Sequence, residues 1–195
     1  MKTNMLGKLR EALISLRKQD DEAIEILQAS VKTGIISRHP ETYLPSLLTL
    51  LSFSTPPQTQ VLEYYALYLL FILEDLFEFY LFISQHTLSS TPKSRKTENV
   101  IPQFVTDVAN AFVSGNYIVY SRILEKADRF EKALILHSPG DLKMRTRLSK
   151  IIAKCYYRVE IDWFDTLVND TRENALSKNW EKEGNMYIIR RQKTS

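Results

Sequence analysis

The sequence predicts an all-α protein, with an α-solenoid-like array of helical hairpins followed by a small C-terminal unit that carries a β-hairpin. Only five glycines and seven prolines occur in 195 residues, which favours long helices over turn-rich sheets. Three segments repeat the order of apolar helix, short polar break and apolar helix. After the third segment, a basic helix leads into two short capped segments and a glycine turn.

The composition sets broad limits on the class of protein. Hydrophobic residues make up 44% and charged residues 25%, as in ordinary globular proteins. Cationic side chains exceed anionic ones by three, which permits an anionic partner without requiring one. Cys155 is the single cysteine, so an internal disulfide is excluded and a reducing compartment is indicated.

The most apolar stretch, residues 61–83, is the candidate for a membrane span. It contains four acids, Glu63, Glu74, Asp75 and Glu78. A span needs about 20 residues with almost no charge, and each acid near its centre costs about 2.5 to 3.5 kcal/mol. We therefore expect two buried helices that meet at Glu74-Asp75, and no membrane contact. At the N-terminus, MKTNMLGKLREALISLRK lacks a long apolar core and predicts an amphipathic helix instead of a signal peptide.

The three repeated segments are LISLRKQDDEAIEIL, LLFILEDLFEFYLFI and VANAFVSGNYIVYSRIL. Their breaks fall at residues 19–21, 74–75 and 114–116. A helix pair buries only one face, so such pairs must stack to form a continuous core. The spacing between them is uneven, which predicts an irregular array over residues 1–138. Four tyrosines on the helical stripes are expected in its core: Tyr64, Tyr68, Tyr117 and Tyr120.

Three polar stretches should interrupt the helices. The proline-rich SFSTPPQTQ, residues 52–60, predicts a turn that no helix crosses. Residues 84–102 are rich in serine and threonine and predict a surface loop. LHSPGD, residues 136–141, should separate the array from the C-terminal unit.

Residues 139–195 predict a winged-helix subdomain that forms one domain with the array. The first helix should bury one face, made of Met144, Leu148, Ile151, Ile152 and Cys155. Asp162 is expected to cap the second helix, and DTRE predicts a third, in which Asp170 and Glu173 form a capping box. Gly184-Asn185 supplies the tight turn of a two-stranded hairpin. Three helices and such a hairpin make a winged helix.

Signatures of catalysis are absent from the sequence. His39, His86 and His137 stand far apart, with no second ligand at a metal-like spacing. Cys155 is expected to be a buried core thiol, not a nucleophile. No glycine-rich loop is present to hold a phosphate. We therefore predict no catalytic residue, metal, cofactor or small-molecule substrate.

A basic row is the candidate nucleic-acid site. Lys143, Arg147, Lys150 and Lys154 recur at spacings of four, three and four, and Arg158 continues the row by four, so they line one side of a helix. The end of the chain adds the remaining candidates, Lys178, Arg190, Arg191 and Lys193. In a winged helix, the third helix and the wing share one surface, so these charges could follow a phosphate backbone.

Three tyrosines are candidates for contacts with bases, and the basic row itself can also be explained without a nucleic acid. Tyr156, Tyr157 and Tyr187 could stack on unpaired bases. A solvated basic face, or one that meets an acidic subunit, would show the same pattern of charges.

Three stretches, EYYALYLLFIL, VANAFVSGNYIVYSRIL and MRTRLSKIIAKCY, carry a resemblance to a known superfamily. With the terminal TRENALSKNW and GNMYII, they resemble PCI domains, the scaffold modules of the proteasome lid, the signalosome and an initiation-factor complex. Within the superfamily, the chain looks most like the Sac/GANP branch of nuclear mRNA-export scaffolds. The resemblance covers about residues 40–194. The arginine-rich lead-in of that branch has no counterpart here, and the lid-type small subunits match the C-terminal unit nearly as well.

The resemblance implies a non-catalytic scaffold in the nucleus. Its expected partners are another PCI-domain subunit, a small acidic protein, and RNA or DNA bound through the basic winged helix. The alternative is a small PCI subunit of the proteasome lid, the signalosome or an initiation-factor complex, with no nucleic acid bound.

Overall fold

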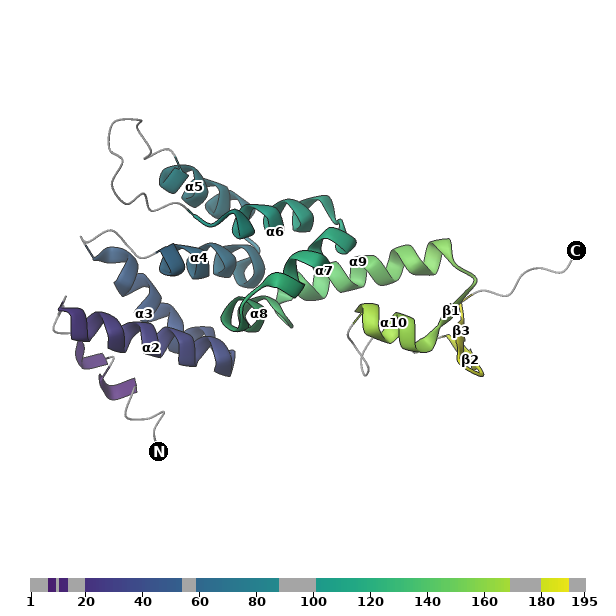
Figure 1. Ribbon diagram of the computed structural model, residues 1–195, viewed down its shortest axis with the longest axis horizontal. Helices are drawn as coiled ribbons and strands as arrows, with labels where there is room; N and C mark the ends of the chain where they lie inside the picture. The colour runs from purple at the N-terminus through teal and green to yellow at the C-terminus, as the bar shows by residue number, and fades with distance from the viewer. Residues whose placement is uncertain are drawn as a thin grey trace, which may run out of the picture.

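A computed structural model describes residues 7–9, 11–13, 20–53, 59–87, 101–168 and 180–189. Within these residues, helices dominate and a small antiparallel sheet lies near the C-terminus, so the predicted fold class is confirmed (Figure 1). The elements, in chain order, are α2 (Asp21–Ser37), α3 (Pro40–Ser52), α4 (Thr59–Tyr68), the π-helical turn η1 (Leu69–Leu73), α5 (Leu76–Thr87), α6 (Gln103–Ser114), α7 (Tyr117–Lys126), α8 (Arg129–Ile135), α9 (Pro139–Cys155), β1 (Arg158–Glu160), α10 (Ile161–Val168), β2 (Glu181–Glu183) and β3 (Met186–Ile188).

The first described hairpin is formed by α2 and α3. Asp20 starts α2, because its carboxylate accepts a 3.0 Å hydrogen bond from the Ala23 amide. The two helices approach closely at Gly34, where a Cβ atom would lie 2.6 Å from the Cβ of Tyr43. The predicted break at residues 19–21 is thus a helix start at Asp20; residues 14–19 lie outside the described residues.

The break at Glu74-Asp75 is confirmed. The α-helix α4 continues as the π-helical turn η1, and Glu74 then adopts a left-handed conformation with φ 56°. Asp75 accepts a 3.0 Å hydrogen bond from the Glu78 amide and so caps α5. Across the described ranges, we find no helix that combines the length and the apolar character needed to cross a bilayer.

The predicted turn at residues 114–116 is also confirmed. Gly115 ends α6 with φ 67°, a conformation that favours glycine, and Asn116 caps α7 by accepting a hydrogen bond from the Val119 amide. The four predicted core tyrosines belong to the core of the array. Tyr64, Tyr68 and Tyr120 are buried, and Tyr117 is partly buried and packs against this core.

Two other predicted breaks are displaced. The loop expected from residue 84 begins later, because α5 continues to Thr87; residues 88–100 lie outside the described residues. Pro139 and Gly140 belong to the first turn of α9, since proline is compatible with that position and Ser138 caps the helix. The separation from the array is therefore limited to residues 136–138.

The 52–60 turn follows the end of α3 at Ser52, and residues 54–58 are outside the described part.

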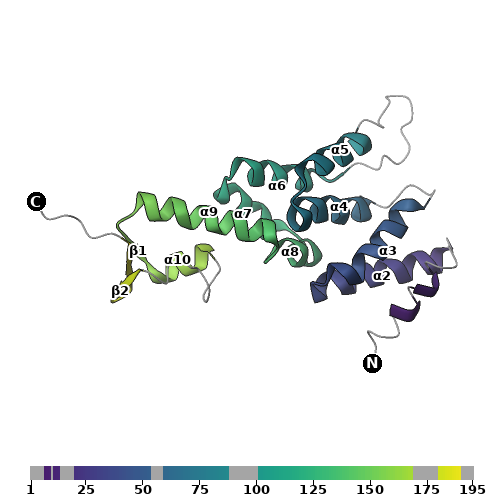
Figure 2. The ribbon, with the colours of Figure 1, turned by 180° about the vertical axis from the view of Figure 1, so that it is seen from behind.

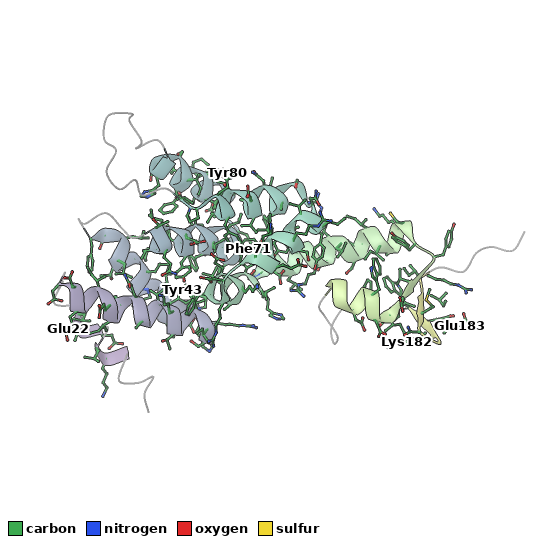
Figure 3. All side chains as sticks on the ribbon, in the orientation of Figure 1. Glu22, Tyr43, Phe71, Tyr80, Lys182 and Glu183 are labelled. Carbon is green, nitrogen blue, oxygen red and sulfur yellow. The ribbon has the colours of Figure 1, made fainter. Side chains whose placement is uncertain are left out.

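Two hydrophobic clusters lie along the molecule. The larger occupies the helical array and includes Phe71, which is labelled in Figure 3. The smaller joins Ile152, Phe164 and Tyr187 in the C-terminal unit. Helix α9 contributes Met144 to the first and Ile152 to the second, and both views show it reaching from the array to the sheet (Figure 2). The domain boundary after residue 138 stays a prediction.

The buried face predicted for α9 is wrong at two positions. Ile151 is 47% exposed and the thiol of Cys155 is also exposed. The buried side instead carries Arg145 and Ser149, which are 6% and 0% exposed. Arg145 is tolerated there because an acid one turn earlier, Asp141, neutralises it.

The C-terminal sheet has three strands, in the order β1-β3-β2, where the sequence predicts two. β3 pairs antiparallel with both neighbours, so Tyr187 lies opposite Val159 and Lys182. The predicted hairpin turn is confirmed, with Gly184 at φ 60°. Asp162 does not cap α10: the helix follows β1 directly and begins at Ile161. The third helix expected from Asp170 lies outside the described residues.

Candidate nucleic-acid and partner surface on helix α9

The start of α9 is fixed by its own sequence. The Ser138 hydroxyl accepts a 3.1 Å hydrogen bond from the Asp141 amide, and Pro139 occupies the first turn. Asp141 also places a negative charge near the helix N-terminus, where the helix dipole favours it. The helix therefore starts at a defined residue, which sets the direction of every later side chain.

A buried polar cluster holds α9 against α7. One carboxylate oxygen of Asp141 accepts a 2.9 Å hydrogen bond from the Tyr120 hydroxyl, and the other pairs with Arg145 at 2.8 Å and 2.9 Å. The backbone amide of His137 also donates to Asp141, at 2.9 Å. Burial and the neighbouring Asp141 raise the pKa of Tyr120 above its ordinary value. The sequence analysis missed this cluster, although an Asp and an Arg four residues apart were a visible signal.

Four of the eight predicted nucleic-acid residues are described. Lys143, Arg147, Lys150 and Lys154 are all exposed on α9, on the side turned away from the buried Asp141 cluster. The structure thus brings these four together in one row, whereas Arg158, expected to continue it, lies in β1 after the end of α9. The other four, Lys178, Arg190, Arg191 and Lys193, lie outside the described residues.

The first two residues of the row contact the helical array. Lys143 forms an ion pair with Glu74 at the end of η1. The guanidinium of Arg147 lies against the end of α6, since a Cβ on Gly115 would be 2.5 Å from its Cζ. The first half of the row is therefore braced by the array, whereas Lys150 lies in the next turn of the helix.

Apolar side chains accompany the charges on this surface. Leu142 is 57% exposed and Ile151 is 47% exposed. A shallow groove of about 460 Å³ is lined by Leu142, Lys143, Arg147 and Lys150, among others. The surface can accordingly meet a phosphate backbone or an acidic, partly apolar protein face.

Two of the three predicted stacking tyrosines are accessible. Tyr156 and Tyr157 are 47% and 50% exposed, directly after α9. The prediction that Tyr187 stacks on bases is wrong. The residue is only 5% exposed, and its ring packs edge-on against Phe164 and Trp180 in the smaller core. Lys182, labelled in Figure 3, lies on β2, and its ammonium is 5.2 Å from the centre of the Tyr187 ring.

A second groove lies between the array and the C-terminal unit. It has a volume of about 850 Å³ and is lined by Tyr117, Leu124 and Lys132 on one side and by Glu160 and Trp163 on the other. Among the described residues, we find no group of three or more His, Cys, Asp or Glu side chains that could hold a metal ion.

Neither a family model nor a curated protein matches this chain. The helical hairpins, the buried Asp141 cluster and the exposed basic row are the features of the chain that bear on its function.

Proposed function

We propose that this chain is a non-catalytic PCI-type scaffold subunit that acts in nuclear mRNA export or transcription-coupled mRNA processing. The observation that carries the proposal is the continuous path of α9 from the core of the helical array into the small three-stranded unit. That arrangement fits the resemblance of the sequence to the Sac/GANP branch. Assembly partners would be another PCI subunit and a small acidic protein.

The basic row would give this scaffold its nucleic-acid contact. Cations spaced by three and four residues repeat about every 5 Å along a helix, so the row presents a line of positive charge to a phosphate backbone. Lys150 and Lys154 extend the row beyond the ion pair at Lys143. The exposed Tyr156 and Tyr157 follow them and would stack on unpaired bases.

A salt titration tests this contact. Binding of single-stranded RNA and duplex DNA is measured by filter retention for the natural chain and for Lys150→Glu/Lys154→Glu. We expect weaker binding and a salt slope reduced by about 2, one for each lost phosphate contact. Arg122→Glu/Lys126→Glu is the matched control, because it makes the same charge change on the exposed side of α7. Unchanged binding in the first variant would exclude Lys150 and Lys154 as contacts.

The second candidate is a small PCI subunit of the proteasome lid, the signalosome or an initiation-factor complex. The apolar Leu142 and Ile151 within the basic row favour it, since they suit a protein partner better than a phosphate backbone. Purification of the tagged chain from its own cells separates the two candidates. Co-purified proteasome ATPases would favour the lid, and a PCI subunit of the export machinery would favour the first proposal.

A further inference from the structure

Helix α5 is apolar on two sides, and the array covers only one of them. On the inner side, Phe79 is 1% exposed and the Phe82 ring packs on Tyr65 at 5.0 Å. Five large apolar side chains on η1 and α5 are exposed, and we name them the outer α5 face: Leu73, Leu76, Phe77, Tyr80 and Leu81. Figure 3 shows Tyr80 on α5, at the edge of the array.

Four residues of the outer α5 face form a stripe along α5. Leu76, Phe77, Tyr80 and Leu81 make two pairs four residues apart and so share one side of the helix, and Leu73 precedes them at the end of η1. Phe77 is 75% exposed, the largest exposed fraction among the large apolar side chains described. A helix that is apolar all round is normally buried, and a contiguous apolar patch marks an interaction surface.

The charged side chains between Leu73 and Leu81 are all carboxylates. No lysine or arginine occurs between His39 and Pro92, a range that covers α3, α4, η1 and α5. Next to the stripe stand Asp75 and the exposed Glu78, while Glu74 is engaged by Lys143. A partner that covers the stripe therefore brings its borders against carboxylates, which favours cations on those borders.

We propose that the outer α5 face docks an amphipathic helix of a partner protein whose apolar stripe is bordered by lysine or arginine. A helix fits because residues spaced by three and four form ridges that a second helix packs against. The inference deepens the proposed scaffold role and rests on it, since it names the chemistry of one partner and the surface that receives it. The five residues of the docking site are distinct from those of the basic row on α9, and the two surfaces meet at the Lys143–Glu74 ion pair.

A peptide-binding experiment on the full chain tests the inference. The probe is a fluorescein-labelled synthetic helix of about 18 residues, or five turns, with leucines on one stripe and lysines along its borders. A matched peptide carries glutamate in place of each lysine. By fluorescence anisotropy, we expect the lysine peptide to bind with a Kd on the order of 10 μM and the glutamate peptide to bind at least about tenfold more weakly.

Variants assign the binding to the face. Phe77→Gln/Leu81→Gln should weaken the lysine peptide at least about tenfold, and Glu78→Lys about threefold at low salt. Val113→Gln/Ile118→Gln is the control, because both side chains are exposed apolar residues elsewhere, at 46% and 63%. Circular dichroism verifies that each variant is folded.

Three outcomes would overturn the inference. They are no binding of the lysine peptide, equal binding of both peptides, and equal loss in the control variant. Light scattering adds a fourth: self-association that Phe77→Gln/Leu81→Gln abolishes would assign the face to a second copy of the chain. Nucleic-acid binding is measured on Phe77→Gln/Leu81→Gln, which leaves the net charge unaltered, and should not change. If the chain bound the lysine peptide but bound no nucleic acid, the proposed nucleic-acid contact would be wrong and the docking inference would stand.

Discussion

The hydroxyl of Tyr120 on α7 donates a 2.9 Å hydrogen bond to the carboxylate of Asp141 on α9. The same carboxylate pairs with Arg145, and the three side chains are 1%, 1% and 6% exposed, respectively. This contact joins two helices through residues that are 21 positions apart in the sequence. It fixes the rotation of α9 and, with it, the direction of the basic row.

Removal of Asp141 should destabilise the protein strongly. Asp141→Ala leaves the Arg145 guanidinium buried without its counterion, which costs about 3 to 5 kcal/mol of the free energy of unfolding. Tyr120→Phe removes one hydrogen bond to a charged group and should cost about 1.5 to 3 kcal/mol. Urea denaturation followed by circular dichroism measures both. Glu125→Ala, at an exposed acid on α7, is the control, and an Asp141→Ala loss no larger than the control's would contradict the prediction.

The turns of the array could be predicted from the sequence because each is a local feature. Gly115 allows a positive φ and Asn116 caps the next helix, so a few neighbouring residues decide the break. β1 could not be predicted in this way. Its three residues become a strand only by pairing with β3, which is far away in the sequence.

In the candidate site, too, some features follow from the local sequence and others depend on tertiary contacts. The basic row follows from the helical spacing alone, and Lys143, Arg147, Lys150 and Lys154 are exposed as predicted. The buried side of α9 does not follow from that spacing, because Arg145 occupies an inward position that an apolar residue would normally take. Only the tertiary contact with Asp141 makes that position possible.

A buried acid should make the stability of the protein depend on pH. Burial, a hydrogen bond with Glu131, and the charges of Glu131 and Asp128 raise the pKa of Glu63 to about 9. In the unfolded chain, this carboxyl ionises near its ordinary value of 4.5. Its contribution to stability is therefore complete below that value and is lost as the pH rises toward 9.

Urea denaturation across this window tests the prediction. Between about pH 6 and pH 8.5, the free energy of unfolding should fall by up to about 1.4 kcal/mol per pH unit because of Glu63. Glu63→Gln keeps a neutral hydrogen-bond donor and should remove this slope. The difference between the two curves isolates Glu63 from all other titrating groups. Parallel curves would show that Glu63 ionises normally in the folded protein.

A buried hydroxyl offers a stabilising substitution. Tyr64 is 2% exposed, and its hydroxyl has no hydrogen-bond partner within the described part of the chain. Tyr64→Phe removes this unsatisfied group and keeps the ring, which packs against Phe130. We expect the free energy of unfolding to rise by about 1 kcal/mol. Tyr120→Phe is the contrast, since that hydroxyl is bonded; a loss of stability in both variants would contradict the prediction.

The last prediction concerns Gly115, which links the end of α6 to the basic row. Gly115→Ala forces a Cβ into a left-handed conformation, at a cost of about 1 to 2 kcal/mol, and also displaces the Arg147 guanidinium. Gly184→Ala is a matched control, because its φ is 60° and no atom lies within 4 Å of the added Cβ.

Both variants should lose stability by similar amounts in urea denaturation, since the backbone strain is similar. Only Gly115→Ala should shift the Nε–H resonance of Arg147 in an NMR spectrum, because only there does the new methyl group meet that side chain. An unshifted resonance would show that Arg147 does not rest on the end of α6, and the bracing of the basic row by the array would be wrong.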